Sequence, residues 1–297
     1  MQPEGESNPD GKVGFAPYVW MLCGCFLFAW MGEFANQLRP LCDWRLVALA
    51  RAGLAFVFAL SLAVATRAPL TFTDPPVLWM RSVAGSLSLL CTFYALSLLR
   101  TSEVLTLTNT FPIWVALLSW PLLRQRPTLA VWAAAVCGVG GVALIQSGAG
   151  SGSGMTALPV TLALVAALTS SVAMLGLNQL KGLHPWAVVT HFSGVATVFV
   201  LGAWLVGGAP DLTPLASGWV VVLLVGVGIS ATLGQMCLTL AFTLGQPSRV
   251  SVVGLAQIVF AMGLDLSFGG EMFGAWTLAG IGLVMLPTAW VMTSREG

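Results

Sequence analysis

The sequence predicts an all-α integral membrane protein, with ten transmembrane helices arranged as two inverted five-helix repeats. Three observations lead to this fold class. Of the 297 residues, 57% are hydrophobic and only 8% are charged, whereas soluble domains average about 25% charged residues. The chain contains ten apolar segments of about 20 residues, the length that crosses the hydrocarbon core as a helix. The two halves of the chain also share a residue pattern.

The ten apolar segments follow one another with short connections. They run over 18–38, 46–66, 76–99, 102–123, 128–147, 156–180, 184–207, 217–243, 248–268 and 272–293. Proline and glycine, which end helices and form turns, occupy most of the connections. The segments lack the alternating pattern of a membrane β-barrel. Helices are therefore predicted for all ten.

The composition between the segments predicts how the chain is divided. A polar N-terminus at 1–17 precedes the first repeat at 18–147, and a Gly/Ser-rich linker occupies 148–155. The second repeat covers 156–293 and a short tail covers 294–297. Gly/Ser-rich linkers are flexible and carry no structure of their own. The linker thus separates two units of similar length.

Matching residues support a duplication. Asn36-Gln37-Leu38-Arg39 recurs as Asn178-Gln179-Leu180-Lys181, an offset of 142 residues from position 36 to position 178. A unit of five helices has an odd number of crossings, so its second copy must be inverted in the membrane. Inverted repeats recur in secondary transporters, where the substrate binds near the midplane between the halves. The duplication therefore predicts a transporter that works by alternating access.

Basic residues in the connections predict the orientation, because cytoplasmic loops are enriched in Lys and Arg. With both termini cytoplasmic, the inside carries seven basic residues and the outside three. The inside set is Lys12, Arg67, Arg124, Arg126, Lys181, Arg249 and Arg295, and the outside set is Arg39, Arg45 and Arg100. Cytoplasmic N and C termini are therefore expected, in what the composition suggests is a bacterial plasma membrane.

Polar residues inside the apolar segments are candidates for substrate binding, because they are costly in lipid and face the bundle interior. In the first segment, Trp30 and Glu33 share one helical face with Gln37. Glu33 fits two roles: an acid that holds a cationic group or takes a proton, or the partner of a structural arginine. In the third segment, Arg81 begins a small, polar stripe, and it fits a packing role as well as substrate contact. Tyr94 lies further along this segment.

The remaining candidates lie in the fourth, eighth and ninth segments. Asn109 precedes Pro112, which removes a backbone hydrogen bond at mid-helix and marks a hinge. Asn109 fits a cavity wall or a hydrogen bond between helices. Gln235 and Gln257 are the candidate polar groups of the second half. The second half has no proline at the position equivalent to Pro112, so the halves are expected to differ at this hinge.

These residues lie within motifs that resemble the EamA type of the drug/metabolite transporter superfamily. The motifs are Trp30-Met-Gly32, Arg81-xxx-Gly85, Phe93-Tyr94-Ala95-Leu96, Thr110-Phe-Pro112, Leu240-Ala241-Phe242 and Gly280-Ile-Gly282. The resemblance implies ten helices with both termini inside. It also implies a central cavity lined by the first, third, fourth, sixth, eighth and ninth helices, and export or exchange of amino acids and other metabolites.

The expected function is secondary transport, as an exporter, of a small polar metabolite, an amino acid or a drug-like compound. The expected partners are this small-molecule substrate and the lipid bilayer. Glycines of the fifth and tenth segments fit packing within the fold or a homodimer. No nucleic-acid partner, cofactor, metal or enzymatic activity is expected, because no basic field or catalytic motif is present. The alternatives are a membrane enzyme acting on a lipid-linked substrate and a non-transporting membrane protein.

Overall fold

The computed structural model describes residues 14–73, 75–98, 101–147, 157–208, 211–269 and 274–294, and these residues form helices without any strand. The helices are α1 (Ala16–Leu38), α2 (Trp44–Leu49), η1 (Ala50–Leu54), α3 (Ala55–Ala65), α4 (Pro76–Leu98), α5 (Thr101–Thr108), α6 (Phe111–Leu123), α7 (Leu129–Ser147), α8 (Ala157–Gln179), α9 (Pro185–Gly207), η2 (Thr213–Ala216), α10 (Gly218–Leu244), α11 (Pro247–Gly254), α12 (Ala256–Gly269) and α13 (Ala275–Thr293). The expected linker at 148–155 and most of both expected terminal segments lie outside these residues.

The ten predicted segments coincide with helices over their described residues. Within the part of the chain that the structure describes, eight helical stretches are long and apolar enough to cross a membrane. One of them joins α2, η1 and α3 into a single span, and another joins α11 and most of α12. The helices are apolar on nearly all sides, which is the pattern of helices whose surroundings are other helices and lipid. The chain is therefore an all-helical integral membrane protein.

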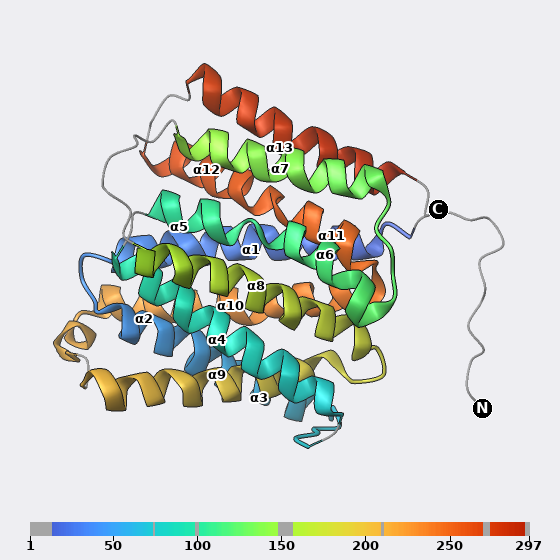
Figure 1. Cartoon of the computed structure of the whole chain (residues 1–297). Helices are drawn as coiled ribbons and strands as arrows, with labels where there is room; N and C mark the ends of the chain where they lie inside the picture. Colours follow the sequence, from blue (N-terminus) through green and yellow to red (C-terminus); the bar gives the residue numbers. More distant parts are fainter. Residues whose placement is uncertain are drawn as a thin grey trace.

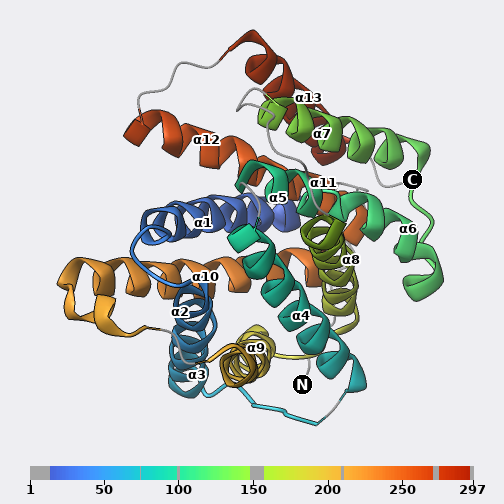
Figure 2. The same ribbon diagram turned by 60° about the vertical axis from the view of Figure 1, so that its left-hand side comes forward.

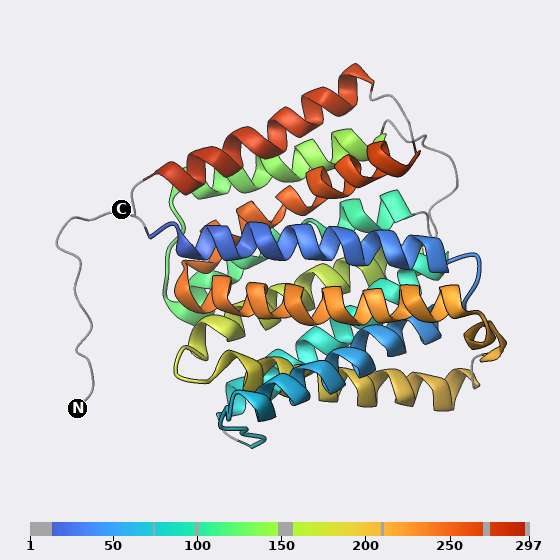
Figure 3. The ribbon, with the colours of Figure 1, turned by 180° about the vertical axis from the view of Figure 1, so that it is seen from behind.

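Figure 1 shows α7 and α13 on one side of the bundle and α3 and α9 on the opposite side. Between these outer pairs, α1 packs along α10, and α8 packs along α4. The first of these pairs lies side by side in Figure 3, and the second is seen in Figure 2. Each central pair joins one helix from each half of the chain, so the core of the molecule is the contact between the halves.

Glycines allow the closest of these helix contacts. A Cβ atom at Gly141 of α7 would lie 2.7 Å from the carbonyl oxygen of Gly280 in α13, and a Cβ atom at Gly280 would lie 2.7 Å from that of Gly141. Side chains there would force the two backbones apart, because small residues at the crossing are what lets helices approach closely. This pair of the predicted glycines packs within the fold. By contrast, Gly140 and Gly282 have no atom within 4 Å of a built Cβ.

The predicted fourth helix is broken where Pro112 was expected to disturb it. α5 ends at Thr108 and α6 begins at Phe111. The break is a tight turn: the Thr110 N–H donates to the Leu107 carbonyl (3.2 Å) and the Ile113 N–H to the Thr110 carbonyl (3.0 Å). Pro112 stands at the start of α6, where its missing N–H costs nothing because the first N–H groups of a helix have no partner inside it.

The predicted ninth helix is broken in the same way, although it contains no proline. The Leu255 N–H donates to the Val252 carbonyl (3.1 Å) and the Ile258 N–H to the Leu255 carbonyl (3.2 Å). These bonds repeat those at Thr110 and Ile113 at a constant offset of 145 residues. The expectation that the halves differ at this point is therefore wrong. At this break, packing takes the role that proline has in the first half. The Leu255 side chain lies against Gly138, where a Cβ atom would lie only 2.5 Å from Cδ1 of Leu255.

Arg249 corrects one part of the orientation estimate. It was counted among the inside basic residues although it falls within the ninth predicted segment, and it is buried within α11, at 4% exposure. Its guanidinium donates to the Ser294 carbonyl (2.8 Å) at the C-terminal end of α13. Cations are favourable at helix C-termini, where carbonyl groups lack partners within the helix. Arg249 therefore stabilises a helix end. Lys12, Arg100 and Arg295 of the same estimate lie outside the described residues.

Candidate functional site

Two of the predicted site residues meet between the halves. Arg81 of α4 donates from Nη2 to Oε1 of Gln235 in α10, at 3.0 Å. The two side chains are 3% and 7% exposed, so this bond lies in the interior. It joins residues 154 positions apart. The sequence proposed both residues separately, and helix packing brings them together.

The surroundings of Arg81 explain the spacing of its motif. Gly85 lies one turn further along α4, and a Cβ atom there would lie 2.6 Å from Nη1 of Arg81 and 2.8 Å from the ring of Phe192. The glycine therefore leaves room for the guanidinium, which lies over the Phe192 ring at 4.0 Å from its centroid. Such a cation–π contact favours a desolvated cation. On the other side, Gly176 of α8 lets that helix approach the Arg81 backbone.

A second polar contact in the interior lies beside Arg81 on α4. The Ser82 hydroxyl and Nδ1 of His191 in α9 form a hydrogen bond of 2.7 Å, and both residues are buried. The Trp79 ring lies perpendicular to the imidazole ring, with a centroid separation of 4.8 Å. Polar side chains from α4, α9 and α10 thus line one region of the interior.

Arg51 is a further charged group of the interior. It lies in η1, a five-residue π-helical segment between α2 and α3. Protein surrounds the residue, although part of its surface stays accessible. Its Nε donates to the sulfur of Met31 in α1 at 3.3 Å, and its positive charge is near enough to act on Arg81. π-Helical segments widen a helix locally and are frequent at functional sites.

The broken helices lie against residues of the opposite half. The Cys25 thiol of α1 donates to the Gly254 carbonyl (3.4 Å), at the break between α11 and α12. The Ser171 hydroxyl of α8 donates to the Phe111 carbonyl (3.0 Å), at the break between α5 and α6. Cys25 and Ser171 are themselves 146 residues apart. Carbonyl groups freed by a break need partners when water is excluded, and the Gly254 carbonyl at the end of α11 has one in Cys25. Each half thus contributes a hydrogen bond beside the break of the other half.

Trp30 and Glu33 make contacts within α1. The Trp30 ring lies 5.6 Å from that of Phe34, and the Glu33 carboxylate accepts a hydrogen bond of 2.8 Å from Gln37. Both predicted residues are partly exposed. Among the described residues, no Lys or Arg lies within ion-pair distance of Glu33. The alternative in which Glu33 pairs with a structural arginine therefore has no partner in this part of the chain.

The other three predicted residues have described contacts with residues other than Arg81 and Gln235. Tyr94 is 41% exposed and its ring lies 5.8 Å from that of Trp44. Asn109 donates to the Leu105 carbonyl (2.7 Å), which caps the end of α5 at the break. Gln257 lies in the first turn of α12, directly after the break at Leu255. Asn109 and Gln257 thus mark the two breaks.

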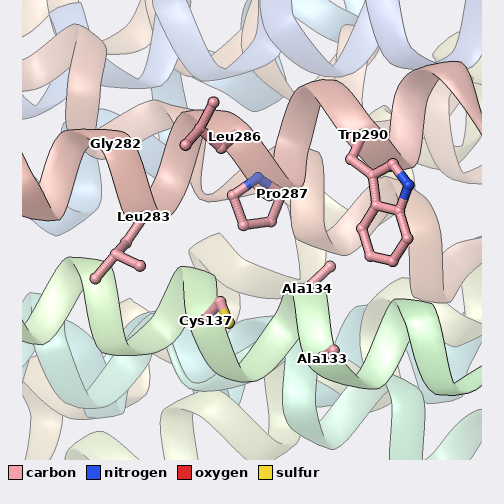
Figure 4. Close-up of a pocket in the computed structure, with 8 residues that line it drawn as sticks. All are labelled: Ala133, Ala134, Cys137, Gly282, Leu283, Leu286, Pro287 and Trp290. Atoms are coloured by element: carbon pink, nitrogen blue, oxygen red, sulfur yellow. The ribbon is translucent and has the colours of Figure 1, made fainter.

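Two surface pockets hold none of the predicted substrate-binding residues. One, of about 310 Å³, is an apolar groove between α7 and α13, lined among others by Cys137, Gly282 and Trp290 (Figure 4). The other, of about 400 Å³, lies between α6 and α7, where the Arg126 guanidinium lies 5.1 Å from the Trp120 ring centroid. The polar interior between the halves is therefore the better candidate site.

Sequence reasoning left Arg51 out of the candidate site. The missed signal was the absence of a carboxylate partner, which depends on where the acidic residues lie in space. Among the described residues, the only ion pair joins Asp43 and Arg45 (3.0 Å) at the start of α2. Neither Arg51 nor Arg81 therefore has a described carboxylate within ion-pair distance, and the composition does not reveal this.

Similar proteins that carry a name are called exporters or transporters. The chain is 28% identical over 223 residues to the "Pseudopaline exporter CntI" of Pseudomonas aeruginosa, covering 75% of this chain and 76% of the exporter. It is 23% identical over 217 residues to an "Uncharacterized transporter" of Helicobacter pylori, covering 69% of each chain. A solved crystal structure shares the fold with a TM-score of 0.81 at 17% identity, covering 93% of this chain and 96% of the other.

The match to a protein family covers both halves. The EamA-like transporter family matches residues 15–147 and again residues 157–293. These ranges include α1 to α7 and α8 to α13, so the family unit occurs twice and the two copies meet at the polar interior described above. The family and the exporter-named relatives point to a transporter and not to an enzyme. The chain belongs to the EamA-like transporter family.

Proposed function

We propose that this protein is a secondary transporter that exports a small polar metabolite, an amino acid or a drug-like compound by alternating access. The observation that carries this mechanism is the pair of equivalent helix breaks, at Thr110 and Leu255, in the two copies of the family unit. Discontinuous helices at a repeat interface commonly form the substrate site of secondary transporters. The exporter name of one relative supports the outward direction.

We further propose ten membrane spans in two inverted repeats, as an odd number of helices per unit requires. The packing pattern supports this arrangement. Exchanging the halves exchanges α1 with α8 and α10 with α4, so the two central pairs map onto each other, while the α7–α13 and α3–α9 pairs map onto themselves. The repeats would span 18–147 and 156–293, with both termini cytoplasmic in a bacterial plasma membrane.

The substrate site would lie between the halves, near the Arg81–Gln235 bond and the two breaks. Residues on both halves would then exchange partners as the halves rock against each other. Pro112 would act as a hinge, because it stands at the break between α5 and α6. Trp30, Glu33, Asn109 and Gln257 would line the path, with Tyr94 nearer its end. A homodimer would be compatible with this site, because the open groove between α7 and α13 lies outside it.

Glu33 would sense charge or carry the coupling proton, since no described basic residue neutralises it. The test is transport by purified protein in proteoliposomes, using a panel of amino acids, nucleosides, polyamines and drug-like cations. Glu33→Gln should lower the rate or remove its pH dependence, whereas Asp211→Asn, which removes an exposed loop charge, should change neither. An unchanged rate and pH profile in Glu33→Gln would refute the role of Glu33.

The same assay separates transport from its alternatives. A ligand that binds only the folded state raises the melting temperature by mass action, so thermal stability of the detergent-purified protein identifies compounds for the flux experiment. Accumulation driven by a gradient supports a secondary transporter. Binding without flux under imposed proton, sodium or counter-substrate gradients would favour a non-transporting membrane protein.

A further inference from the structure

We infer that the polar interior binds an oxyanion group of the substrate, a carboxylate or a phosphate, through Arg51 and Arg81. The inference rests on the proposed transport function and names the chemical class of its substrate. It starts from an electrostatic imbalance: two guanidinium groups lie inside the bundle, and no described carboxylate lies within ion-pair distance of either.

The imbalance matters because buried charges are costly unless they are paired and hydrogen-bonded. Among the described residues, Arg81 has one side-chain acceptor, the neutral amide oxygen of Gln235. The Phe192 ring adds a favourable contact but no negative charge. Arg51 lies close enough for the two positive charges to act on each other, which raises the cost of holding both in place. A bound anion would reduce both the cost of burying the charges and the repulsion between the two arginines.

Hydrogen-bonding capacity points the same way. A guanidinium carries five N–H donors in a planar fork that matches carboxylate and phosphate oxygens. In the described part of the chain, Nε of Arg81 is buried without any acceptor. Nε of Arg51 faces the Met31 sulfur, and a thioether is only a weak acceptor. The pair therefore keeps unused donors for a ligand.

The backbone around both arginines is shaped to place them. Gly85 clears space for the Arg81 guanidinium, because even a methyl group there would lie 2.6 Å from Nη1. Arg51 lies in the π-helical segment η1, which interrupts an otherwise α-helical span. A packing role alone would not need an interrupted helix at this position. Arg81 comes from α4 and Arg51 from η1, so a ligand between them would also contact Gln235 of the second half.

An anionic substrate has a consequence for direction. An inside-negative membrane potential drives negative charge outward in proportion to the charge moved. An exporter that moves an anion without a compensating ion would gain driving force from that potential. Its flux should therefore increase when the potential is made more negative inside.

The test uses the full-length protein in detergent and matched ligands that differ in the anionic group. The pairs are phenylalanine with phenylalaninamide, succinate with succinamide, and glycerol 3-phosphate with glycerol. The anionic member of at least one pair should raise the melting temperature, and its neutral or cationic counterpart should not. Stabilisation by the carboxylates alone or by the phosphate alone identifies which oxyanion the site takes.

Variants then connect the binding to the arginines. Arg51→Gln and Arg81→Gln should each weaken the Kd about 10- to 100-fold, the loss expected for a charged hydrogen bond. Lys at either position should rescue binding poorly, because its ammonium lacks the planar fork. Lys181→Gln removes an exposed loop charge and should leave the Kd unchanged.

Gln235→Glu is the most discriminating variant, because it keeps both arginines and adds a carboxylate beside Arg81. The new carboxylate would lie at hydrogen-bond distance from Arg81 and would neutralise it from within the protein. The melting temperature of the ligand-free protein should rise, while stabilisation by the anion should be lost. If Arg81 had only a structural role, stability would change but ligand binding would not.

The outcomes distinguish this inference from the function on which it rests. No stabilisation by any anionic member, equal stabilisation by the neutral counterparts, or retained binding in Gln235→Glu would overturn the inference. Flux of a neutral or cationic compound that does not depend on Arg51 and Arg81 would overturn it and leave the transporter proposal intact. Oxyanion binding without flux would support the inference and count against transport.

Discussion

The contact between α7 and α13 gives a prediction whose size follows from the structure. A Cβ atom at Gly280 would lie 2.7 Å from the Gly141 carbonyl oxygen and 3.0 Å from the Ile145 backbone nitrogen. Both atoms belong to the backbone, so neither can move aside by changing a rotamer. Ordinary contact begins at 3.4 Å, and the helices would have to separate by about 0.7 Å to reach it.

Overpacking of this kind costs about 1–3 kcal/mol in well-packed cores. Gly280→Ala should therefore lower the free energy of unfolding by this amount, even though alanine is the better helix former by about 1 kcal/mol. Gly282→Ala is the matched control on the same helix. Its built Cβ has nothing within 4 Å, so only the helix propensity changes, and the protein should be unchanged or slightly more stable.

The assay is thermal or denaturant unfolding of both variants in detergent, read by the exposure of buried thiols. The two substitutions should act with opposite signs. Equal effects of Gly280→Ala and Gly282→Ala would refute the reasoning, because the two differ only in what the added methyl group meets. Loss of stability in Gly282→Ala alone would place a partner, such as a second copy of the chain, in the groove of Figure 4.

Three further predictions concern a helix end, a surface ion pair and the first break. Asn178 donates to the Phe242 and Gly245 carbonyls (2.9 and 3.0 Å) at the end of α10, so Asn178→Ala should lower the free energy of unfolding by about 1–3 kcal/mol. The equivalent substitution at the exposed Asn36 should change it by less than about 0.5 kcal/mol. The Arg45 side chain lowers the pKa of Asp43, so this pair should stabilise the folded protein above the unfolded pKa of about 3.9 and lose its effect as the pH falls through the lower folded value. Unfolding of wild type and Asp43→Asn between pH 7 and pH 3 should show a difference that shrinks with acid, and a constant difference would contradict the pairing. Pro112→Ala removes the ring that hinders a continuous helix across the first break and should slow transport while leaving ligand binding intact, which flux and melting-temperature assays measure separately.

Several features of the fold could be predicted because they depend on residue type alone. The ten apolar segments coincide with helices in the described part of the chain, since apolar runs of that length exclude other structures in lipid. The duplication was predicted from short matches such as Asn36-Gln37 with Asn178-Gln179, and the family match repeats over both halves. Pro112 indicated a disturbed helix, because proline cannot donate to the preceding turn.

The second break shows where residue type was insufficient. Without a proline, the segment around Gln257 was expected to continue as an unbroken helix, whereas the chain turns at Leu255. The cause is packing against the other half, where Cys25 bonds the Gly254 carbonyl and Gly138 accepts the Leu255 side chain. Such contacts join residues more than a hundred positions apart and leave no local signal.

The sequence by itself determined that this chain spans a membrane and that it consists of two related halves. These properties follow from hydropathy and from repetition, which are read along the chain. Only the tertiary structure decided that Arg81 meets Gln235, that Arg51 lies near Arg81 without a carboxylate, and that both halves carry a break. These properties depend on which helices pack together and at what depth, because the cost of a buried charge is set by its neighbours in space.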